Sequence, residues 1–188
     1  KMTFKEVIEK HGYPVISKEN AQKIDQYRND KSEKTKKTRM FGNISKNGKL
    51  CGKLPNKWRY MINAPFKISS KCCNKLKKDP FYKFEKQTGK FPIEGVRKQE
   101  SAVRNQRQGC NMFDKKRPTS WALGSWTDDD INNYIKDNNI KLAEVYNMGY
   151  ERTGCMFCMF GCHLEKESRF ERMKKTHPKQ YDYCMTKL

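Results

Sequence analysis

Apolar residues at the start of the chain recur three and four positions apart, the spacing of one face of an α-helix. Thr3 and Glu6 form the capping-box pattern at the start of this stretch, and Val7 and Ile8 lie on its apolar face. Gly12 stands where the pattern stops, and the Tyr-Pro pair after it disfavours further helix. We therefore predict a first helix between Thr3 and Gly12.

Further helices are indicated by cap residues and by proline in a first turn. They are expected to begin after Ser17, after Ser69 or Ser70, at Pro80 and after Thr127. Carboxylates stabilise a helix N-terminus, so the run Asp128–Asp130 is interpreted as a first turn rather than as a metal site. A basic helical region is expected near the C-terminus, around Phe170 and Tyr181.

Residues 91–96 form the clearest strand candidate, which we expect inside a small sheet. Polar residues that suit an anion follow it, namely Arg97, Ser101 and Arg104. Ligands bind outside the carboxyl ends of strands in open α/β sheets, and the planar guanidinium donates two hydrogen bonds to a sulfate or phosphate. We therefore predict anion binding by these three residues; a structural salt bridge is the alternative for each arginine.

The composition changes between residues 31 and 59, which hold ten Lys or Arg and one acid, Glu33. We interpret this segment as a flexible basic insertion or as an arm that becomes ordered on a phosphate backbone. A merely solvated loop is the alternative. The nucleic-acid candidates on it are Lys34, Lys36, Lys37 and Arg39. The expected organisation is N-terminal helices at 1–30, the basic insertion at 31–59 and a cysteine-bearing domain at 60–188.

The formal net charge is +20, and only 35% of residues are hydrophobic. Such an excess of positive charge favours a polyanionic partner, which is a nucleic acid, a nucleotide or an anionic surface. A soluble basic surface without a specific partner is the alternative. No apolar run approaches the roughly 18 residues of a membrane span, and no signal peptide is recognisable. We therefore expect a cytoplasmic protein with no membrane partner and a modest core.

Two cysteine pairs, Cys72-Cys73 and Cys155-x-x-Cys158, are separated by 81 residues (155 − 73 − 1). In a cytosolic protein, clustered cysteines more often bind metal than form disulfides. A [4Fe–4S] cluster and a zinc ion both take four thiolates. Structural zinc sites usually separate their cysteines by two to four residues, so the adjacent pair favours the cluster, with zinc as the alternative.

Several stretches resemble motifs of one known family. These are the paired cysteines with the lysines after them (72–77), the Gly-x-Arg…Ser…Arg segment (95–104), the Trp-Thr helix entry (125–128), the approach to the second pair (149–155) and Arg-Phe-x-Arg-Met-Lys-x-Thr-His-Pro (169–178). Together they resemble the cluster-binding adenylylsulfate reductases of the phosphoadenylylsulfate (PAPS) reductase family, and most of all its phage and prophage members.

The resemblance implies a helix-rich α/β fold, the C-terminal half of an adenine-nucleotide alpha-hydrolase-like domain around a small sheet, tied by the four-cysteine site. It also implies a sulfonucleotide or other adenine nucleotide as substrate, Lys77 between cluster and substrate, and a thioredoxin-like reductant. The family's nucleophile is a C-terminal cysteine, for which Cys184 is the candidate, although its Glu-Cys-Gly-Leu-His-like surroundings are missing. The Ser-Gly-Gly-Lys-Asp-Ser-like phosphate loop is also missing, so we expect either a short form or part of a longer polypeptide.

Two functions follow. The first is an iron–sulfur protein with sulfonucleotide reductase or sulfurtransferase chemistry, provided that it is joined to a nucleotide-binding half. The alternative is a catalytically inactive, basic protein of a phage or mobile element. Such a protein would bind DNA, RNA or a nucleoprotein as a regulator or an anti-defence factor.

Overall fold

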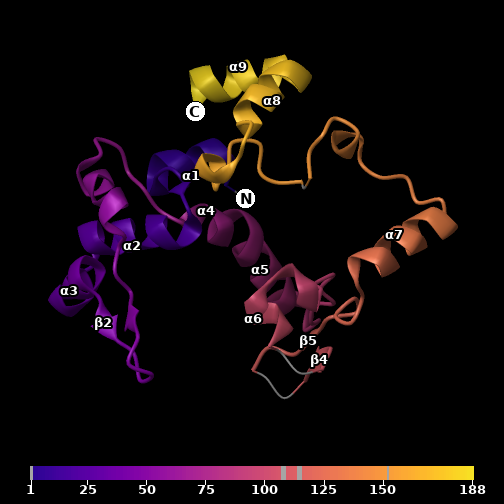
Figure 1. Ribbon diagram of the computed structural model, residues 1–188, viewed down its shortest axis with the longest axis horizontal. Coiled ribbons are helices and arrows are strands. Elements are labelled where there is room, and N and C mark those ends of the chain that lie inside the picture. The colour runs from indigo at the N-terminus through magenta and orange to yellow at the C-terminus, as the bar shows by residue number, and fades with distance from the viewer. Residues whose placement is uncertain (1, 107–108, 114–115, 152) are drawn as a thin grey trace. The chain divides into compact units, whose positions relative to one another are not determined.

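The computed structural model describes residues 2–106, 109–113, 116–151 and 153–188. Contacts divide the chain into two units, a first unit of Lys1–Pro80 with Thr153–Leu188 and a second unit of Phe81–Arg152. Figure 1 shows the elements of both. The division expected from the sequence, at 1–30, 31–59 and 60–188, is based on charge and flexibility rather than on contacts, and it stays a prediction. No helix in the described ranges is both long and apolar enough to cross a membrane.

The first unit is mainly helical. Its helices are α1 (Phe4–His11), α2 (Lys18–Asn29), α3 (Glu33–Phe41), α4 (Lys71–Cys73), α8 (Arg169–Thr176) and α9 (Pro178–Lys187). Its 3-10 helices are η1 (Asn56–Asn63) and η5 (Cys162–Leu164), and η2 (Asn74–Lys78) is a π-helix. Its short strands are β1 (Val15–Ile16), β2 (Asn43–Ile44), β3 (Leu50–Cys51) and β6 (Met159–Phe160). Helix α5 (Asp79–Thr88) begins here and continues into the second unit.

The first helix begins and ends where the sequence predicted. The Glu6 backbone N–H donates to the Thr3 hydroxyl oxygen at 3.3 Å, and the Thr3 backbone N–H donates to the Glu6 carboxylate at 2.6 Å. Gly12 ends the helix with φ +102°, and a Cβ at this position would collide with the backbone of Lys67. Gly12 thus permits a close approach between the end of α1 and the segment that leads to the first cysteine pair.

An extended segment, residues 13–16, is the centre of the first unit. On one edge it pairs in parallel with residues 67–69, through Tyr13 N–H to Lys67 O at 2.8 Å and Ser69 N–H to Tyr13 O at 3.2 Å. On the other edge β1 pairs in parallel with β6, and the Gly161 N–H donates to Ile16 O at 2.7 Å. Two distant parts of the chain are therefore fixed on either side of one short segment.

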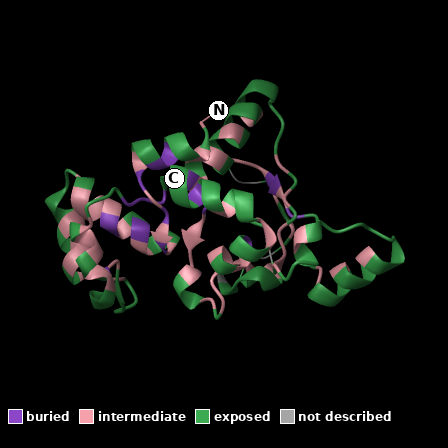
Figure 2. Cartoon of the chain, turned by 90° about the horizontal axis from the view of Figure 1, so that it is seen from above, coloured by how far each residue is buried: buried purple, intermediate pink, exposed green. Residues whose placement is uncertain are grey.

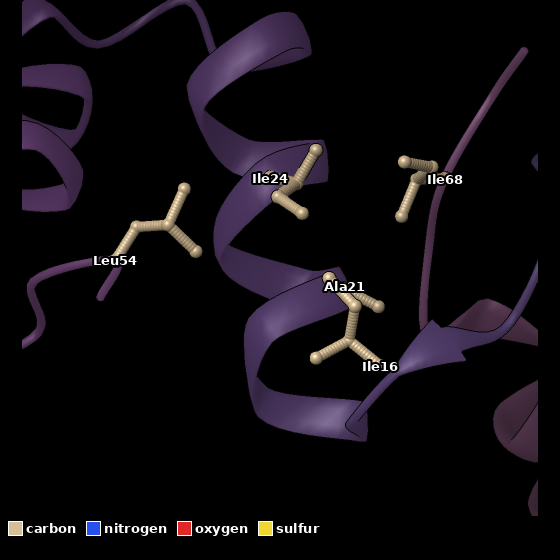
Figure 3. Close-up of a cluster of buried hydrophobic side chains, with 5 residues drawn as sticks. All are labelled: Ile16, Ala21, Ile24, Leu54 and Ile68. Carbon is tan, nitrogen blue, oxygen red and sulfur yellow. The ribbon is translucent and has the colours of Figure 1, made fainter. Parts of the chain in front are cut away.

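The main apolar cluster surrounds α2 and is drawn in Figure 3. It consists of the buried residues Ile16, Ala21, Ile24, Leu54 and Ile68. Ala21 and Ile24 are the buried residues of α2. A second cluster joins α1 to the C-terminal helices α8 and α9 through Ile8, Phe157, Met173 and Cys184. Buried positions are sparse along the rest of the ribbon (Figure 2), in keeping with the modest core expected from composition.

The basic segment 31–59 contains α3 and the β2–β3 hairpin. Leu54 at its end is 1% exposed in the main cluster. Arg39 donates to the Gln26 side-chain oxygen at 2.8 Å and to the Gly52 carbonyl at 3.1 Å. Arg59 donates to the Met40 carbonyl. Some of its cations therefore hold the segment itself together.

The second unit contains short elements and one longer helix. They are η3 (Lys98–Glu100), α6 (Ala102–Asn105), the antiparallel hairpin of β4 (Asn111–Met112) with β5 (Thr119–Ser120), α7 (Asp128–Asp137) and η4 (Glu144–Tyr146). Helix α7 begins at the predicted capping box, with the Asp130 N–H donating to the Thr127 hydroxyl at 3.1 Å. The run of acids occupies its first turn, as expected.

The predicted strand at 91–96 was wrong. Ile93 makes one isolated parallel bridge with Ser120 and is 76% exposed. The Ser120 N–H donates to Pro92 O at 3.2 Å, and the Glu94 N–H donates to Ser120 O at 2.8 Å. Pro92 has no N–H, so its neighbourhood cannot continue a ladder on both edges. The described residues form three separate two-stranded sheets instead of one small sheet.

Candidate metal centre

The parallel pairing around residues 13–16 carries both cysteine pairs. Residues 67–69 on one edge lead directly into Cys72 and Cys73 on α4. Strand β6 on the other edge directly follows Cys158. Four residues of extended chain therefore separate the two segments from which the predicted ligands extend. All four cysteines belong to the first unit.

The first pair lies in a polar turn at the start of α4. The Ser69 hydroxyl accepts the Lys71 N–H at 3.3 Å, so Ser69 rather than Ser70 supplies the side-chain contact at this end. Cys72 is 5% exposed. Burial, and after it the neighbouring Cys73 and Cys158 thiols, raise the pKa of the Cys72 thiol to about 12.

The second pair lies in a turn, in which the Cys158 N–H donates to the Cys155 carbonyl at 3.1 Å. Phe157 between them is buried and anchors the loop, edge-on to Phe4 at 6.3 Å and tilted against Phe170 at 5.5 Å between ring centroids. Aromatic pairs of this kind add to the stability that burial provides. The loop is therefore fixed by its apolar middle residue, with the cysteines on either side.

Electrostatic contacts connect the four thiols. Burial raises the pKa of Cys155, the ammonium group of Lys77 opposes this, and the Cys158 and Cys73 thiols raise it again. Cys72 is influenced by Cys73 and Cys158 in the same way. Each of the four predicted ligands is therefore near at least one other. Lys77 lies close enough to lower the pKa of Cys155, and its position between cluster and substrate stays a prediction.

The donor set is thiol sulfur, which as the thiolate binds both iron–sulfur clusters and zinc. Positive charge from a bound metal group would stabilise these thiols as thiolates. A single zinc at about 2.3 Å from each sulfur would need all four sulfurs in one tight tetrahedron. Within the residues that the structure describes, no group of three or more His, Cys, Asp or Glu side chains is arranged to hold a metal ion.

Arg169 is a site residue that the sequence did not single out. Its guanidinium donates to the Cys158 carbonyl at 3.0 Å and pairs with Glu165 at 2.5 Å. The Glu165 carboxylate, chiefly through its hydrogen bond, raises the pKa of Arg169. The arginine therefore holds the backbone of the second pair from the start of α8. An Arg four residues after a Glu is the sequence signal, but it does not reveal the carbonyl contact.

The predicted anion-binding set lies in the second unit and is engaged locally. Arg97 forms an ion pair with Asp128, and Arg104 forms one with Glu100. The Ser101 hydroxyl accepts the Arg104 N–H at 3.3 Å and so caps α6. Each arginine has the structural salt bridge that was its alternative. Anion binding by these residues stays a prediction.

Cys184, the candidate nucleophile, lies on α9 within the second apolar cluster and is 1% exposed. Burial raises the pKa of its thiol. A nucleophilic cysteine needs a stabilised thiolate and access to substrate. Its position in this structure therefore gives the nucleophile prediction no support.

The nucleic-acid candidates on α3 differ from one another. Lys34 and Lys37 are exposed, whereas Lys36 pairs with Glu33 at 2.9 Å. Arg39 points inward to the contacts described above. Of the four, Lys34 and Lys37 are thus the cations that a phosphate backbone could reach without breaking an existing contact.

Comparison with known proteins gives the family. Residues 16–160 match the phosphoadenosine phosphosulfate reductase domain, which covers most of the chain, and the chain therefore belongs to that family. An adenosine 5'-phosphosulfate reductase of Oceanobacillus iheyensis is 33% identical over 85 residues, which are 45% of this chain and 35% of that protein. The uncharacterized protein MJ0973 of Methanocaldococcus jannaschii is 25% identical over 132 residues, 68% of this chain and 31% of that protein. The matched stretches thus span about a third of each curated relative.

Proposed function

We propose that this chain is the cysteine-bearing part of a sulfonucleotide reductase-type protein and that Cys72, Cys73, Cys155 and Cys158 hold a [4Fe–4S] cluster. The observation that carries the proposal is the parallel pairing of segments 67–69 and 159–160 with residues 13–16. It supports a shared centre because the two segments next to the cysteine pairs, which are 81 residues apart, pair with the same short stretch of chain. A zinc ion on the same cysteines is the alternative.

The surrounding residues suggest what such a centre would do. A bound cluster would supply positive charge to four thiolates and a redox-capable site. Lys77, next to Cys155, would hold the negatively charged end of a sulfonucleotide or other adenine nucleotide close to it. Phe157 and Phe170 would exclude water from the loop. Reductase chemistry would use a thioredoxin-like reductant, and sulfurtransferase chemistry is the other form of the proposal.

Metal content tests the proposal. Protein purified without oxygen should be brown and contain about four iron atoms per chain, with matching sulfide. Cys72→Ser and Cys155→Ser should lose most of this iron, whereas Cys51→Ser, at an exposed position on β3, should keep it. One tightly held zinc per chain would overturn the cluster and keep the site. Metal-free protein whose thermal stability is unchanged by Cys72→Ser would overturn both.

A second function, nucleic-acid binding, is supported by α3. The helix buries none of its residues, and Lys34 and Lys37 are exposed on it. Each phosphate contact releases counterions and adds about −0.9 to the log–log salt slope on duplex DNA. Lys34→Ala with Lys37→Ala should flatten that slope by about two contacts, while Lys36→Ala, already paired with Glu33, should change it little. An unchanged slope in the double variant would leave α3 as a solvated helix.

A further inference from the structure

A pocket of about 320 Å³ lies between the end of α1, the last turns of α2 and the segment that leads to α4. All of its lining residues belong to the first unit. Its ionisable lining residues are Lys10, His11, Asp25, Arg28, Lys67 and Lys71. Four permanent cations therefore face one carboxylate. The pocket thus has an excess of three positive charges before His11 is counted.

Three of the four lining cations have no carboxylate partner in the described part of the chain, and one of them, Arg28, is fixed by backbone carbonyls. Arg28 donates to the Phe66 carbonyl at 2.8 Å and to the Ala64 carbonyl at 2.6 Å, which fixes its guanidinium and leaves its charge uncompensated. Lys71 pairs with Asp25 at 3.2 Å. For Lys10 and Lys67 no ion pair exists within the described ranges of the chain, although Lys67 makes a long contact of 3.5 Å with the Glu9 carbonyl.

His11 supplies an unused polar atom beside these cations. Its Nε2 is buried and has no hydrogen-bond partner in the described part of the chain. Buried polar atoms of this kind are rare in folded proteins, and each one calls for an explanation. Because His11 lines the pocket, an oxyanion there would lie beside its imidazole and would offset the charge of the lysines around it.

We propose that this pocket binds the phosphate group of a small phosphomonoester. Such a group carries about two negative charges and three acceptor oxygens, which matches the excess positive charge of the lining cations Lys10, Arg28 and Lys67. The volume lies at the lower end of the range for small-ligand sites. A duplex phosphodiester carries only one charge per phosphate and does not enter a concave pocket. The proposal does not depend on the metal centre.

The three histidines of the chain give a direct measurement. Their ring signals are recorded by NMR while inorganic phosphate, AMP, adenosine or sulfate is added at constant ionic strength. We expect saturable shifts of the His11 signals with phosphate and with AMP, tighter for AMP, and none with adenosine. Sulfate that binds as well as phosphate, together with AMP that binds no better, would overturn the small-ligand assignment.

Two matched variants separate the pocket from general charge. Lys10→Met should weaken AMP binding about tenfold, because it removes a charge-assisted contact. Lys5→Met removes the same charge from the same helix outside the pocket and should leave the affinity nearly unchanged. Equal losses in both would show non-specific attraction and overturn the proposal. Iron content of Lys10→Met is measured alongside; it should equal that of the unaltered protein, so failure here is distinct from failure of the metal centre.

Discussion

The two units stabilise themselves differently. The first unit contains both apolar clusters and nearly all of the buried hydrophobic residues that the structure describes. In the described part of the second unit, Trp121 is the one large hydrophobic side chain that is buried. Other apolar side chains of that unit lie in the open, among them Phe81, Phe84, Phe91, Ile93 and Phe113. Similar residue types therefore form a core in one unit and an exposed surface in the other.

Polar contacts take the place of a core in the second unit. Arg117 binds Glu85 with two hydrogen bonds of 2.8 and 2.5 Å and contacts Glu94 at 3.4 Å. The indole N–H of Trp121 donates to the other oxygen of Glu94 at 3.2 Å. These contacts connect α5, the segment after it and the hairpin. The comparison teaches that segments distant in sequence can be joined by directional bonds when little apolar area is buried.

The largest expected effect comes from the core of the first unit. Ile24→Ala should lower the free energy of unfolding by about 2–5 kcal/mol, because Ile24 is 0% exposed and its truncation leaves a cavity. The measurement is hydrogen exchange of the α2 amides together with urea unfolding. Ile24→Val is the control and should cost only about 0.5–1.5 kcal/mol. A loss below that of the control would mean that Ile24 is not part of a well-packed core.

A smaller effect is expected from the polar network of the second unit. Arg117→Met removes the paired hydrogen bonds to Glu85, and we expect a loss of about 1 kcal/mol because the guanidinium is partly exposed. Hydrogen exchange should speed up in the β4–β5 hairpin and remain unchanged in α2. Arg117→Lys keeps the charge without the planar fork and should be intermediate. Faster exchange in both units would contradict their independence.

The smallest effect is the response to pH. Burial is the main cause that lowers the folded-state pKa of His11. The positive charges of Lys71, Lys10 and Lys75 lower this pKa as well, and the carboxylate of Asp25 opposes them. The unfolded chain then binds the proton first, so the first unit should lose stability as the pH falls below about 6.5. Arg117 lowers the pKa of Glu85, so its contribution to the second unit should fade only below about 4.5.

Amide exchange rates, corrected for their intrinsic pH dependence, would show which of the two units loses stability first as the pH falls. Exchange in α2 should begin to accelerate at a higher pH than exchange in the β4–β5 hairpin. In His11→Gln the earlier change should disappear. If the hairpin responded first, the assignment of these two groups to the pH response would be wrong.

The sequence predicted those features that depend on neighbouring residues. The Thr3–Glu6 and Thr127–Asp130 capping boxes formed as expected, because both partners lie within one helical turn. The resemblance of residues 72–77 and 149–155 to family motifs led to the family that the domain match shows. The strand at 91–96 failed because a strand needs a partner whose position local pattern cannot supply.

The amino-acid sequence by itself determined the starts of the helices capped by Thr3, Ser17 and Thr127, the family and the identity of the candidate cysteines, since these rest on local hydrogen bonds, spacing and motif. Helix α3, inside the basic segment, was not predicted. Only the tertiary structure decided that residues 13–16 lie between the two cysteine segments, that Arg169 holds the Cys158 carbonyl, and that four cations of α1, α2 and the α4 approach surround one pocket. The physical reason is that parallel strand pairing, and a pocket lined by cations from several segments, both depend on residues that are far apart in the chain. Their partners are fixed by packing of the whole unit and leave no periodic signal in the sequence.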